Sequence, residues 1–182
     1  IDLNALIPFR MRPGIEDAFA QDLDLFYWLA ELAEWTGGGV MRRLKPVEVV
    51  RTMAETVALE MDLRFEAAAA SELSENFAGD STFRVPRIDW SRTSKRVLTL
   101  ERVSGIPIDE REALIAAGHD PRAIIAKAAT ALFHQAFRDG FFHADLHPGN
   151  LFVDQDGHIV AVDFGIMGRL DLRTRNYLAE ML

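Results

Sequence analysis

Three residues in the last third of the chain, Asp145, Asn150 and Asp163, have the side chains and the order expected of a divalent-cation site. Carboxylate and carboxamide oxygens are hard donors, and Mg²⁺ is usually held in proteins by one or two carboxylates together with substrate phosphates. Asn150 and Asp163 supply such donors. Asp145 is then free to orient an attacking oxygen or to accept its proton. These residue types therefore predict the transfer of a phosphoryl group.

A predicted β-hairpin brings two of these residues together. Residues 151–153 are a short apolar run, residues 154–157 contain the Asp-Gly signal of a tight turn, and residues 158–162 return as a second strand. Asn150 precedes the hairpin and Asp163 follows it, so both side chains can converge on one ion. The alternative interpretation is an ordinary hairpin whose flanking acids are solvated.

The same residues match two kinase motifs. His143, Asp145 and Asn150 have the spacing of H-x-D-x-x-x-x-N, and Asp163 opens the tripeptide D-F-G. Either motif alone is weak, but the two in this order, with strands between them, are specific. In kinases the D-F-G aspartate holds Mg²⁺. The pattern predicts ATP and Mg²⁺ as ligands, Asp145 as the catalytic residue, and Asn150 and Asp163 as metal ligands.

Composition and charge limit the function classes. The chain has 182 residues, of which 49% are hydrophobic and 26% charged, which is typical of one globular domain or a large part of one. Its formal net charge is −8 and it has no basic stripe, so we expect no nucleic-acid partner. Cysteine is absent, which excludes disulfides, and no apolar run approaches the roughly 18 residues of a membrane span.

Hydrophobic periodicity and breaker residues predict a mainly helical chain. The Gly run at 37–39 follows a helix rather than a strand, so it predicts a helix end and a flexible turn, not a phosphate-binding loop. The first ten residues show little strand character. Helices are expected at 15–36, 46–77, 109–117, 121–138 and from 171 or 172 to the end, and strands at 83–86 and 96–100.

Across almost its whole length, the sequence resembles the UbiB/AarF family of atypical protein-kinase-like proteins. The Glu-x-Asp at 60–62 followed by Glu-Ala-Ala at 66–68 is the most specific match, because ordinary protein kinases and small-molecule kinases lack it. The other matching segments are 12–15, 85–86, 101–107 and 137–170. The resemblance implies an α+β, protein-kinase-like fold, with a partial N-lobe at 1–103 that includes the helix-C equivalent, and a mostly helical C-lobe at 104–182.

The resemblance also implies roles for four nucleotide-binding residues. Glu66 is similar to the helix-C glutamate that pairs with the ATP-positioning lysine. Glu60 and Asp62 are similar to the family's own acidic pair, against which a family-specific N-terminal extension packs. Glu101 falls in the hinge that meets the adenine.

Function and location follow from the same resemblance. Family members are described as ATPases or unorthodox kinases that act on or near lipid quinone intermediates, which implies a role in ubiquinone biosynthesis together with other proteins of that pathway. The resemblance places the protein in the bacterial cytoplasm, at the periphery of the inner membrane. Membrane contact is expected through parts outside this chain, which lacks an initial Met and ends inside a predicted helix.

Two positions depart from the kinase pattern. Phe9 occupies the place where the family carries its phosphate-anchoring lysine, and none of the lysines, at positions 45, 95 and 127, lies in a strand before the helix-C segment. The chain is therefore either a piece of a longer protein or a degenerate member. Ala144 replaces the arginine of H-R-D that receives an activation-loop phosphate, and no A-P-E follows. We expect neither a protein substrate nor control by loop phosphorylation.

Two other functions compete with a UbiB-like kinase. The segment 145–150 also resembles aminoglycoside and choline phosphotransferases, although those enzymes lack the Glu-x-Asp and Glu-Ala-Ala pair. A non-catalytic, pseudokinase-type interaction module is favoured by Phe9 and disfavoured by the intact Asp145, Asn150 and Asp163.

Overall fold

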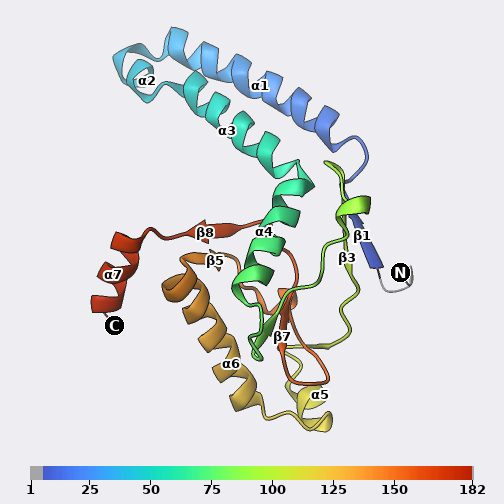
Figure 1. Ribbon diagram of the computed structural model, residues 1–182. Helices are drawn as coiled ribbons and strands as arrows, with labels where there is room; N and C mark the ends of the chain where they lie inside the picture. The colour runs from blue at the N-terminus through green and yellow to red at the C-terminus, as the bar shows by residue number, and fades with distance from the viewer. Residues whose placement is uncertain (1–5, 182) are drawn as a thin grey trace.

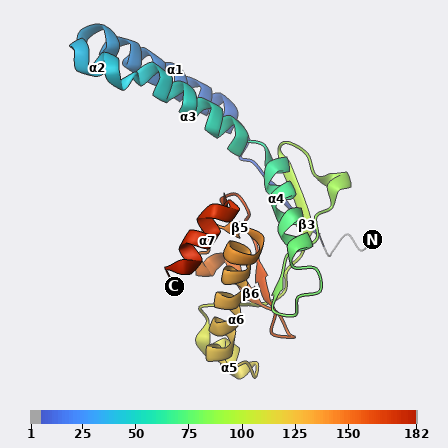
Figure 2. The ribbon, with the colours of Figure 1, turned by 60° about the vertical axis from the view of Figure 1, so that its left-hand side comes forward.

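A helical arm projects from the rest of the molecule (Figures 1 and 2). The computed structural model describes residues 6–181, and the arm consists of α1 (Ile15–Thr36), α2 (Gly38–Leu44) and α3 (Pro46–Glu60). The predicted end of α1 at Thr36 is confirmed. The flexible turn expected at 37–39 is wrong, because Gly37 alone separates α1 from α2, which begins at Gly38. The arm is therefore a continuous helical hairpin.

The single helix predicted at 46–77 is divided at residues 61–62 into α3 and α4 (Leu63–Asn76). The carboxylate of Asp62 accepts a hydrogen bond from the backbone N–H of Arg64 at 3.1 Å, which caps the start of α4. The N–H of Leu63 donates to the carbonyl of Lys95 at 2.9 Å. Both N–H groups therefore bond outside the i→i−4 pattern, and a new helix starts where periodicity predicted a continuous one.

Strand β1 (Leu6–Arg10) pairs antiparallel with β3 (Val97–Glu101). The weak strand character expected of the first ten residues is therefore wrong for residues 6–10. Proline is tolerated in edge strands, and β1 contains Pro8. The register places Phe9 opposite Leu98, and Leu98 packs with Leu100 against Ala67 of α4. The sheet thus covers the first part of α4.

The predicted hairpin lies in a four-stranded sheet with the order β2-β7-β6-β4. Its members are β2 (Phe83–Arg84), β4 (Ile106–Pro107), β6 (Leu151–Val153) and β7 (Ile159–Ala161). Leu151 pairs with Ala161, and Val153 with Ile159, as the hairpin prediction requires. The expected strands at 83–86 and 96–100 exist in shorter or shifted form, but they belong to different sheets.

Helices and one further strand pair complete the body. The helix predicted at 121–138 is α-helical to Phe133 and continues as a π-helical segment to Asp139. Strands β5 and β8 pair antiparallel and bracket the segment that carries the kinase motifs. The remaining elements are α5 (Arg111–Ala116), α6 (Pro121–Phe133), the π-segment (His134–Asp139), β5 (Phe141–His143), β8 (Met167–Arg169), α7 (Leu172–Glu180) and the 3₁₀ turns η2 (Trp90–Arg92) and η4 (Pro148–Asn150).

The larger hydrophobic core joins residues from both sides of the expected lobe boundary at 103/104. Leu73 and Phe77 of α4 and Phe83 of β2 pack with Ile159 of β7 and Phe164 in one cluster. The pairing of β2 with β7 crosses the same boundary. The two parts therefore share a core, and the mixture of helices and sheets confirms the predicted α+β class.

Gly140 fixes the path into β5, and its substitution tests that constraint. Its φ is +68°, and an added Cβ would lie 2.6 Å from the carbonyl oxygen of Leu170. Gly118 has a similar φ of +87° but open space around the same position. We expect Gly118→Ala to lower the free energy of unfolding by about 1–2 kcal/mol, the cost of a left-handed alanine. Gly140→Ala should cost about 1–3 kcal/mol more because of the clash.

Urea denaturation of both variants measures the difference. Equal losses of stability in the two variants would show that the contact between Gly140 and Leu170 does not constrain the chain.

Candidate functional site

A buried imidazole joins the two motif-bearing loops. His143 is only 3% exposed, and its Nδ1 accepts a hydrogen bond from the backbone N–H of Asp145 at 3.2 Å. Its Nε2 lies 2.5 Å from the backbone carbonyl of Asp163. Because Nδ1 accepts, Nε2 must carry the proton and donate to that carbonyl. His143 therefore sets the spacing between the loop of Asp145 and the loop of Asp163.

The π-helical segment positions this histidine. The side-chain carbonyl of Gln135, which is fully buried in this segment, accepts a hydrogen bond from the backbone N–H of His143 at 2.9 Å. A π-turn adds a residue to a helical turn and so changes the direction of the side chains that follow; such turns occur frequently at functional sites. The segment between α6 and β5 thus carries a polar anchor within an otherwise apolar core.

Asn150 and Asp163 lie at the same end of the hairpin, as predicted. The N–H of Val162 donates to the carbonyl of Asn150 at 2.8 Å, which extends the strand pairing to the motif residues. Asp163 adopts a left-handed conformation with φ +67°, which aspartate tolerates better than most residues. Its Oδ1 accepts the N–H of Gly165 at 3.2 Å, so the carboxylate is held by its own loop.

A cavity of about 370 Å³ lies between the sheet of β1 and β3, the helix α4 and the hairpin of β6 and β7. This volume falls within the range of small-molecule sites. Three side chains with carboxylate or carboxamide oxygens line it: Glu66, Asn150 and Asp163. The rest of the lining comes from Phe9, Arg10, Met11, Leu63, Leu100 and Val162. The structure therefore brings together three of the predicted site residues around one space.

Glu66 reaches the D-F-G loop. Its Oε1 accepts the backbone N–H of Phe164 at 3.1 Å, although 98 residues separate the two in the chain. Burial raises the pKa of the Glu66 carboxyl; the bond from Phe164 opposes this shift and the negative charge of Asp163 adds to it. Two carboxylates thus face the same cavity at an energetic cost, and a cation between them would relieve the cost.

Phe9 lies where the family's lysine is expected. It is opposite Leu98 in the sheet, and residues directly opposite one another in an antiparallel pair share a face. Leu98 packs on α4, so Phe9 lies on the face that is turned toward Glu66. Phe9 is half exposed, at 50%, and lines the cavity.

Glu60 and Asp62 line a second cavity of about 400 Å³, to which Glu66 also contributes. A hydrogen bond from the guanidinium of Arg64 lowers the pKa of Asp62 to about 2. The Arg64 Nη2 lies 2.6 Å from Asp62 Oδ2. The pair is therefore near Glu66 but on a different side of it from Asn150, and Asp62 is occupied as a helix cap and ion-pair partner.

Glu101 and Asp145 lie outside these cavity linings. Arg84 Nη1 lies 3.1 Å from Glu101 Oε1, and the N–H of Arg87 donates to Oε2 at 3.2 Å. Partial burial acts to raise the pKa of Glu101, but these bonds outweigh it and hold the pKa below its ordinary value. The Glu101 side chain thus connects β3 to Arg84 of β2 and to Arg87 in the segment that follows β2. Asp145 is exposed on its loop.

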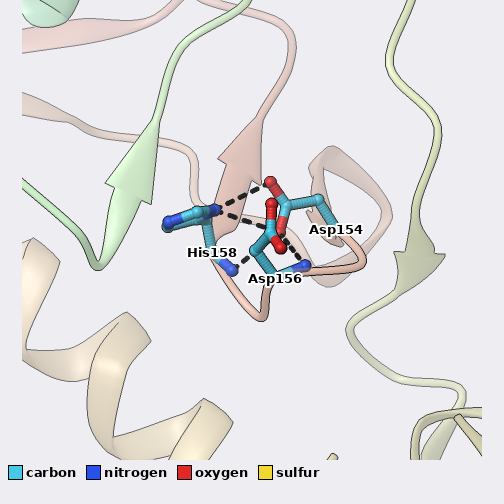
Figure 3. A group of neighbouring side chains, drawn as sticks. All are labelled: Asp154, Asp156 and His158. Carbon is cyan, nitrogen blue, oxygen red and sulfur yellow. Dashed lines mark hydrogen bonds and ion pairs between the residues drawn. The ribbon is translucent and has the colours of Figure 1, made fainter.

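A second group of potential metal ligands, Asp154, Asp156 and His158, occupies the β6–β7 turn (Figure 3). It lies at the opposite end of the hairpin from Asn150 and Asp163. Oδ1 of Asp154 accepts the backbone N–H groups of Asp156 and His158 at 3.0 and 2.9 Å, and the His158 ring lies 3.0 Å from Oδ2. These bonds use Asp154 as the acceptor of a turn, so the chemistry of the group is accounted for without an ion.

Sequence reasoning missed Gln135 altogether and did not predict the capping role of Asp62. Gln135 lies within a predicted apolar helix, and only its polar side chain among apolar neighbours could have indicated a buried anchor. The sequence predicts Asp62 as a nucleotide-site residue. An aspartate directly before helical residues is also a typical N-cap, so it could have indicated a helix start at residue 63. The role of Gln135 depends on a π-turn that helical periodicity does not predict, and the role of Asp62 depends on local capping that competes with periodicity.

The comparisons with known proteins identify the family of this chain. The model of the ABC1 atypical kinase-like domain matches residues 10–182. The chain is 47% identical over 178 residues to UbiB of Marinobacter nauticus, and 40% identical over 185 residues to UbiB of Xylella fastidiosa, both described as probable protein kinases. These alignments cover 94% and 98% of this chain but 32% and 33% of the relatives, so the chain spans about a third of their length.

One solved structure supports the fold. The complex of Rv3197 with erythromycin from Mycobacterium tuberculosis superposes with a TM-score of 0.66 and 26% identity, over 90% of this chain and 40% of that one. The predicted kinase-like fold and the resemblance to the UbiB/AarF family are therefore confirmed.

The turn role of Asp154 predicts an acid-sensitive contribution to stability. Partial burial acts to raise the pKa of Asp154, but the bonds from the backbone and ring of His158 and from the N–H of Asp156 outweigh it and lower the pKa. A lowered folded-state pKa means that the stabilisation is present above the unfolded pKa of about 3.9 and is lost as the pH falls through the folded value. Asp154→Ala should cost about 1–3 kcal/mol at pH 7.

Thermal unfolding of the wild type and Asp154→Ala from pH 7 to pH 2 measures this contribution, with Asp154→Asn as the control. Asparagine retains the turn acceptor, so it should cost less than alanine. A difference between the wild type and the alanine variant that persists unchanged to pH 2 would contradict the assignment.

Proposed function

The chain belongs to the ABC1 atypical kinase-like family, and from this premise we propose that it carries the nucleotide site of an ATP-dependent, UbiB-like kinase or ATPase. The observation that supports this proposal is the convergence of Glu66, Asn150 and Asp163 on one cavity. His143 connects the loop of Asp145 to the same cavity through the backbone of Asp163. Each residue of the two motifs thus has a place in one arrangement.

The oxygen donors of this cavity fit Mg²⁺. Asn150 offers a carboxamide oxygen and Asp163 a carboxylate, which suits a small, hard cation that takes few protein ligands. Glu66 adds a second carboxylate to the lining of the same cavity, which supports a cation there. In this proposal Asn150 and Asp163 hold the ion, and the ion would neutralise negative charge on the phosphates of ATP.

The other residues then position the reactants. Asp145 is exposed at the end of a loop whose backbone is tied to His143, so it is available to orient a hydroxyl or a water molecule as nucleophile. Glu66 holds the D-F-G loop through the N–H of Phe164. Catalysis in this class rests on positioning and on charge stabilisation. Glu60 and Asp62 are proposed as the acidic pair beside Glu66, and Glu101 as part of the hinge that meets the adenine.

Because Phe9 stands in place of a lysine, we expect low ATP affinity and slow ATP hydrolysis. A lysine at this position would place a positive charge beside the nucleotide phosphates, and losing one preorganised charge contact typically costs about 3–4 kcal/mol of transition-state stabilisation. The chain with Phe9 should therefore bind ATP weakly and hydrolyse it slowly. This residue also supports the second candidate function, a non-catalytic module that binds partners through a kinase-like fold.

The acceptor and the cellular setting are part of the proposal. The segment after Asp163 leads through β8 directly into α7, which leaves little room for a peptide-docking platform and argues for water or a small molecule as acceptor. We propose lipid quinone intermediates and other ubiquinone-biosynthesis proteins as partners, at the cytoplasmic face of a bacterial inner membrane. Among the described residues, no helix has both the length and the apolar character to cross a membrane. Membrane contact is assigned to other parts of the parent protein.

Replacing Asp163 and Asp145 separately tests metal binding and chemistry. With Mg²⁺ and ATP at 100 times the Kd, ligand binding stabilises a protein by about 2.7 kcal/mol. Asp163→Asn should abolish the rise in Tm that MgATP causes. Asp145→Asn should keep that rise but lower ATP turnover by about 10²–10⁴-fold, as expected for the loss of a general base.

The control for both variants is Asp109→Asn, an exposed carboxylate outside the site. Retention of the MgATP-dependent shift in Asp163→Asn would remove the metal role from that residue, and unchanged turnover in Asp145→Asn would remove the catalytic role from Asp145. Absence of turnover in the wild type would support the non-catalytic alternative.

Placing a lysine at position 9 tests whether this position contributes to nucleotide binding. In Phe9→Lys the ammonium group would face Glu66 and the nucleotide phosphates, so we expect MgATP to bind at least about tenfold more tightly, a gain of about 1.4 kcal/mol. Phe9→Met, which is apolar and flexible, is the matched control. Adding Glu66→Gln to Phe9→Lys should remove part of the gain, because the lysine then loses its partner. Isothermal titration calorimetry measures each affinity, and equal affinities for the lysine and methionine variants would refute the assignment of position 9.

A further inference from the structure

An ion pair links helix α4 to the segment that follows the D-F-G motif. Nη1 and Nη2 of Arg169 in β8 donate to the two carboxylate oxygens of Glu72 in α4, at 2.8 and 2.5 Å. The two residues are 97 positions apart in the chain. A bidentate pair of this kind fixes the orientation of both groups as well as their distance. Strand β8 is therefore held beside α4 at a defined point (Figure 1).

The pairing of β8 with β5 holds the arginine end of this link. Arg169 is opposite Phe141 in the antiparallel pair, and its guanidinium lies 4.4 Å from the centre of the Phe141 ring. Phe141 is buried and belongs to the larger core. His143, in the same strand as Phe141, pairs with Met167. The guanidinium is thus attracted to the face of an aromatic ring in the strand that carries the buried imidazole of the site.

A second contact joins the same two segments. Glu66, six residues before Glu72 on α4, accepts the backbone N–H of Phe164 at 3.1 Å. Six residues span about 9 Å of an α-helix. The chain from Phe164 to Arg169 therefore meets α4 at both of its ends, and the order of the two contacts is the same along the helix and along the segment.

The space between these two contacts is not filled by the packing of the helix against the segment. The cavity of about 400 Å³ lies there, and its lining includes Ala69 of α4 and residues 165–167. Within this stretch Ile166 is 59% exposed. Closely packed side chains resist displacement, whereas a gap leaves room for movement. The polar contacts at the two ends therefore have a large share in setting the distance between α4 and the D-F-G loop.

The exposure of the ion pair favours a positioning role over a stabilising one. The side chain of Arg169 is 66% exposed and that of Glu72 is 39% exposed. Exposed ion pairs contribute little to the free energy of unfolding, because water and salt screen them and two long side chains lose rotamer freedom. Movement of one loop needs much less free energy than global unfolding. The pair can therefore hold a loop while it hardly affects the stability of the whole chain.

We propose that Glu72 and Arg169 are positioning residues, which hold the D-F-G loop at a fixed distance from α4 so that Glu66 and Asp163 line one cavity. The inference rests on the proposed function, in which Asp163 is a metal ligand. When either partner of the ion pair is lost, the bond from Phe164 to Glu66 is the one that remains of the two contacts. The loop then moves away from α4 more often, and the carboxylate of Asp163 moves with it.

Hydrogen exchange of the 182-residue chain without nucleotide, measured by NMR, tests the proposal directly. In Glu72→Ala and in Arg169→Gln, the amide of Phe164 should exchange about threefold faster than in the wild type, an effect of the size expected for one exposed ion pair. The charge-exchanged double variant Glu72→Arg, Arg169→Glu restores opposite charges at the same place. Its exchange rate should return toward the wild-type value.

Two further variants define the chemistry of the link. Arg169→Lys keeps the charge but cannot form two parallel bonds, so its Phe164 amide should exchange faster than that of the wild type. The matched control is Glu48→Ala, which removes an exposed carboxylate that lies 3.2 Å from Lys45 in the arm. This control should leave the exchange at Phe164 unchanged.

Calorimetric titration with MgATP measures the consequence for the site. Glu72→Ala and Arg169→Gln should each weaken MgATP binding about threefold, and the double variant should recover the affinity. The Tm without nucleotide should be almost the same in all of these variants, because the pair is exposed. A lower Tm together with wild-type exchange at Phe164 would assign the pair to the stability of the fold and would refute the positioning role.

The remaining outcomes distinguish this proposal from the proposed function. Unchanged exchange at Phe164 in both single variants would overturn the positioning role, even if the chain binds MgATP. Faster exchange that the charge-exchanged double variant does not reverse would also overturn it, because the two side chains would then act separately. Absence of MgATP binding in the wild type would count against the proposed function, while the exchange rates would still decide whether the pair holds the loop.

Discussion

The geometry of the site depends on one buried imidazole. His143 accepts the N–H of Asp145 through Nδ1 and donates to the carbonyl of Asp163 through Nε2, so a single ring determines how far apart the two loops lie. Its own backbone is held by Gln135, which the π-helical segment directs into the core. A buried polar network of this kind is costly when any member is missing, because the remaining groups lose their partners in a region without water. The positions of the proposed catalytic and metal-binding residues thus depend on hydrogen bonds made in the buried core.

Holding Glu66 and Asp163 at one cavity has an electrostatic cost. Burial raises the pKa of Glu66, and the nearby charge of Asp163 raises it further, while only the N–H of Phe164 opposes the shift. A neutral residue at position 66 would be easier to accommodate in the protein alone. The arrangement is favourable in the presence of a cation, since positive charge between two carboxylates converts their repulsion into attraction. A site whose stability is compromised without its ligand is a common consequence of preorganising charge for catalysis.

The sequence predicts those parts of this structure that depend on local pattern. The end of α1, the hairpin of β6 and β7, and the proximity of Asn150 and Asp163 follow from periodicity, a turn signal and motif spacing. Two features required non-local information: strand β1 exists because β3 pairs with it, and β2 joins β7 across more than 70 residues of chain. The end of α3 combines a local cap of α4 by Asp62 with the long-range bond from Leu63 to Lys95. Periodicity cannot detect the cap, because the apolar spacing continues across the break.

The break at Asp62 connects the arm to the site. Lys95 lies where three elements meet: its carbonyl accepts the N–H of Leu63 at the start of α4, and its ammonium lies 3.1 Å from Glu16 at the start of α1. Arg96 approaches the same carboxylate at 3.6 Å. The start of α1 is therefore connected to the start of α4 through the two residues that precede β3. Because α4 also carries Glu66, these contacts connect the start of the arm to the helix that lines the proposed nucleotide cavity.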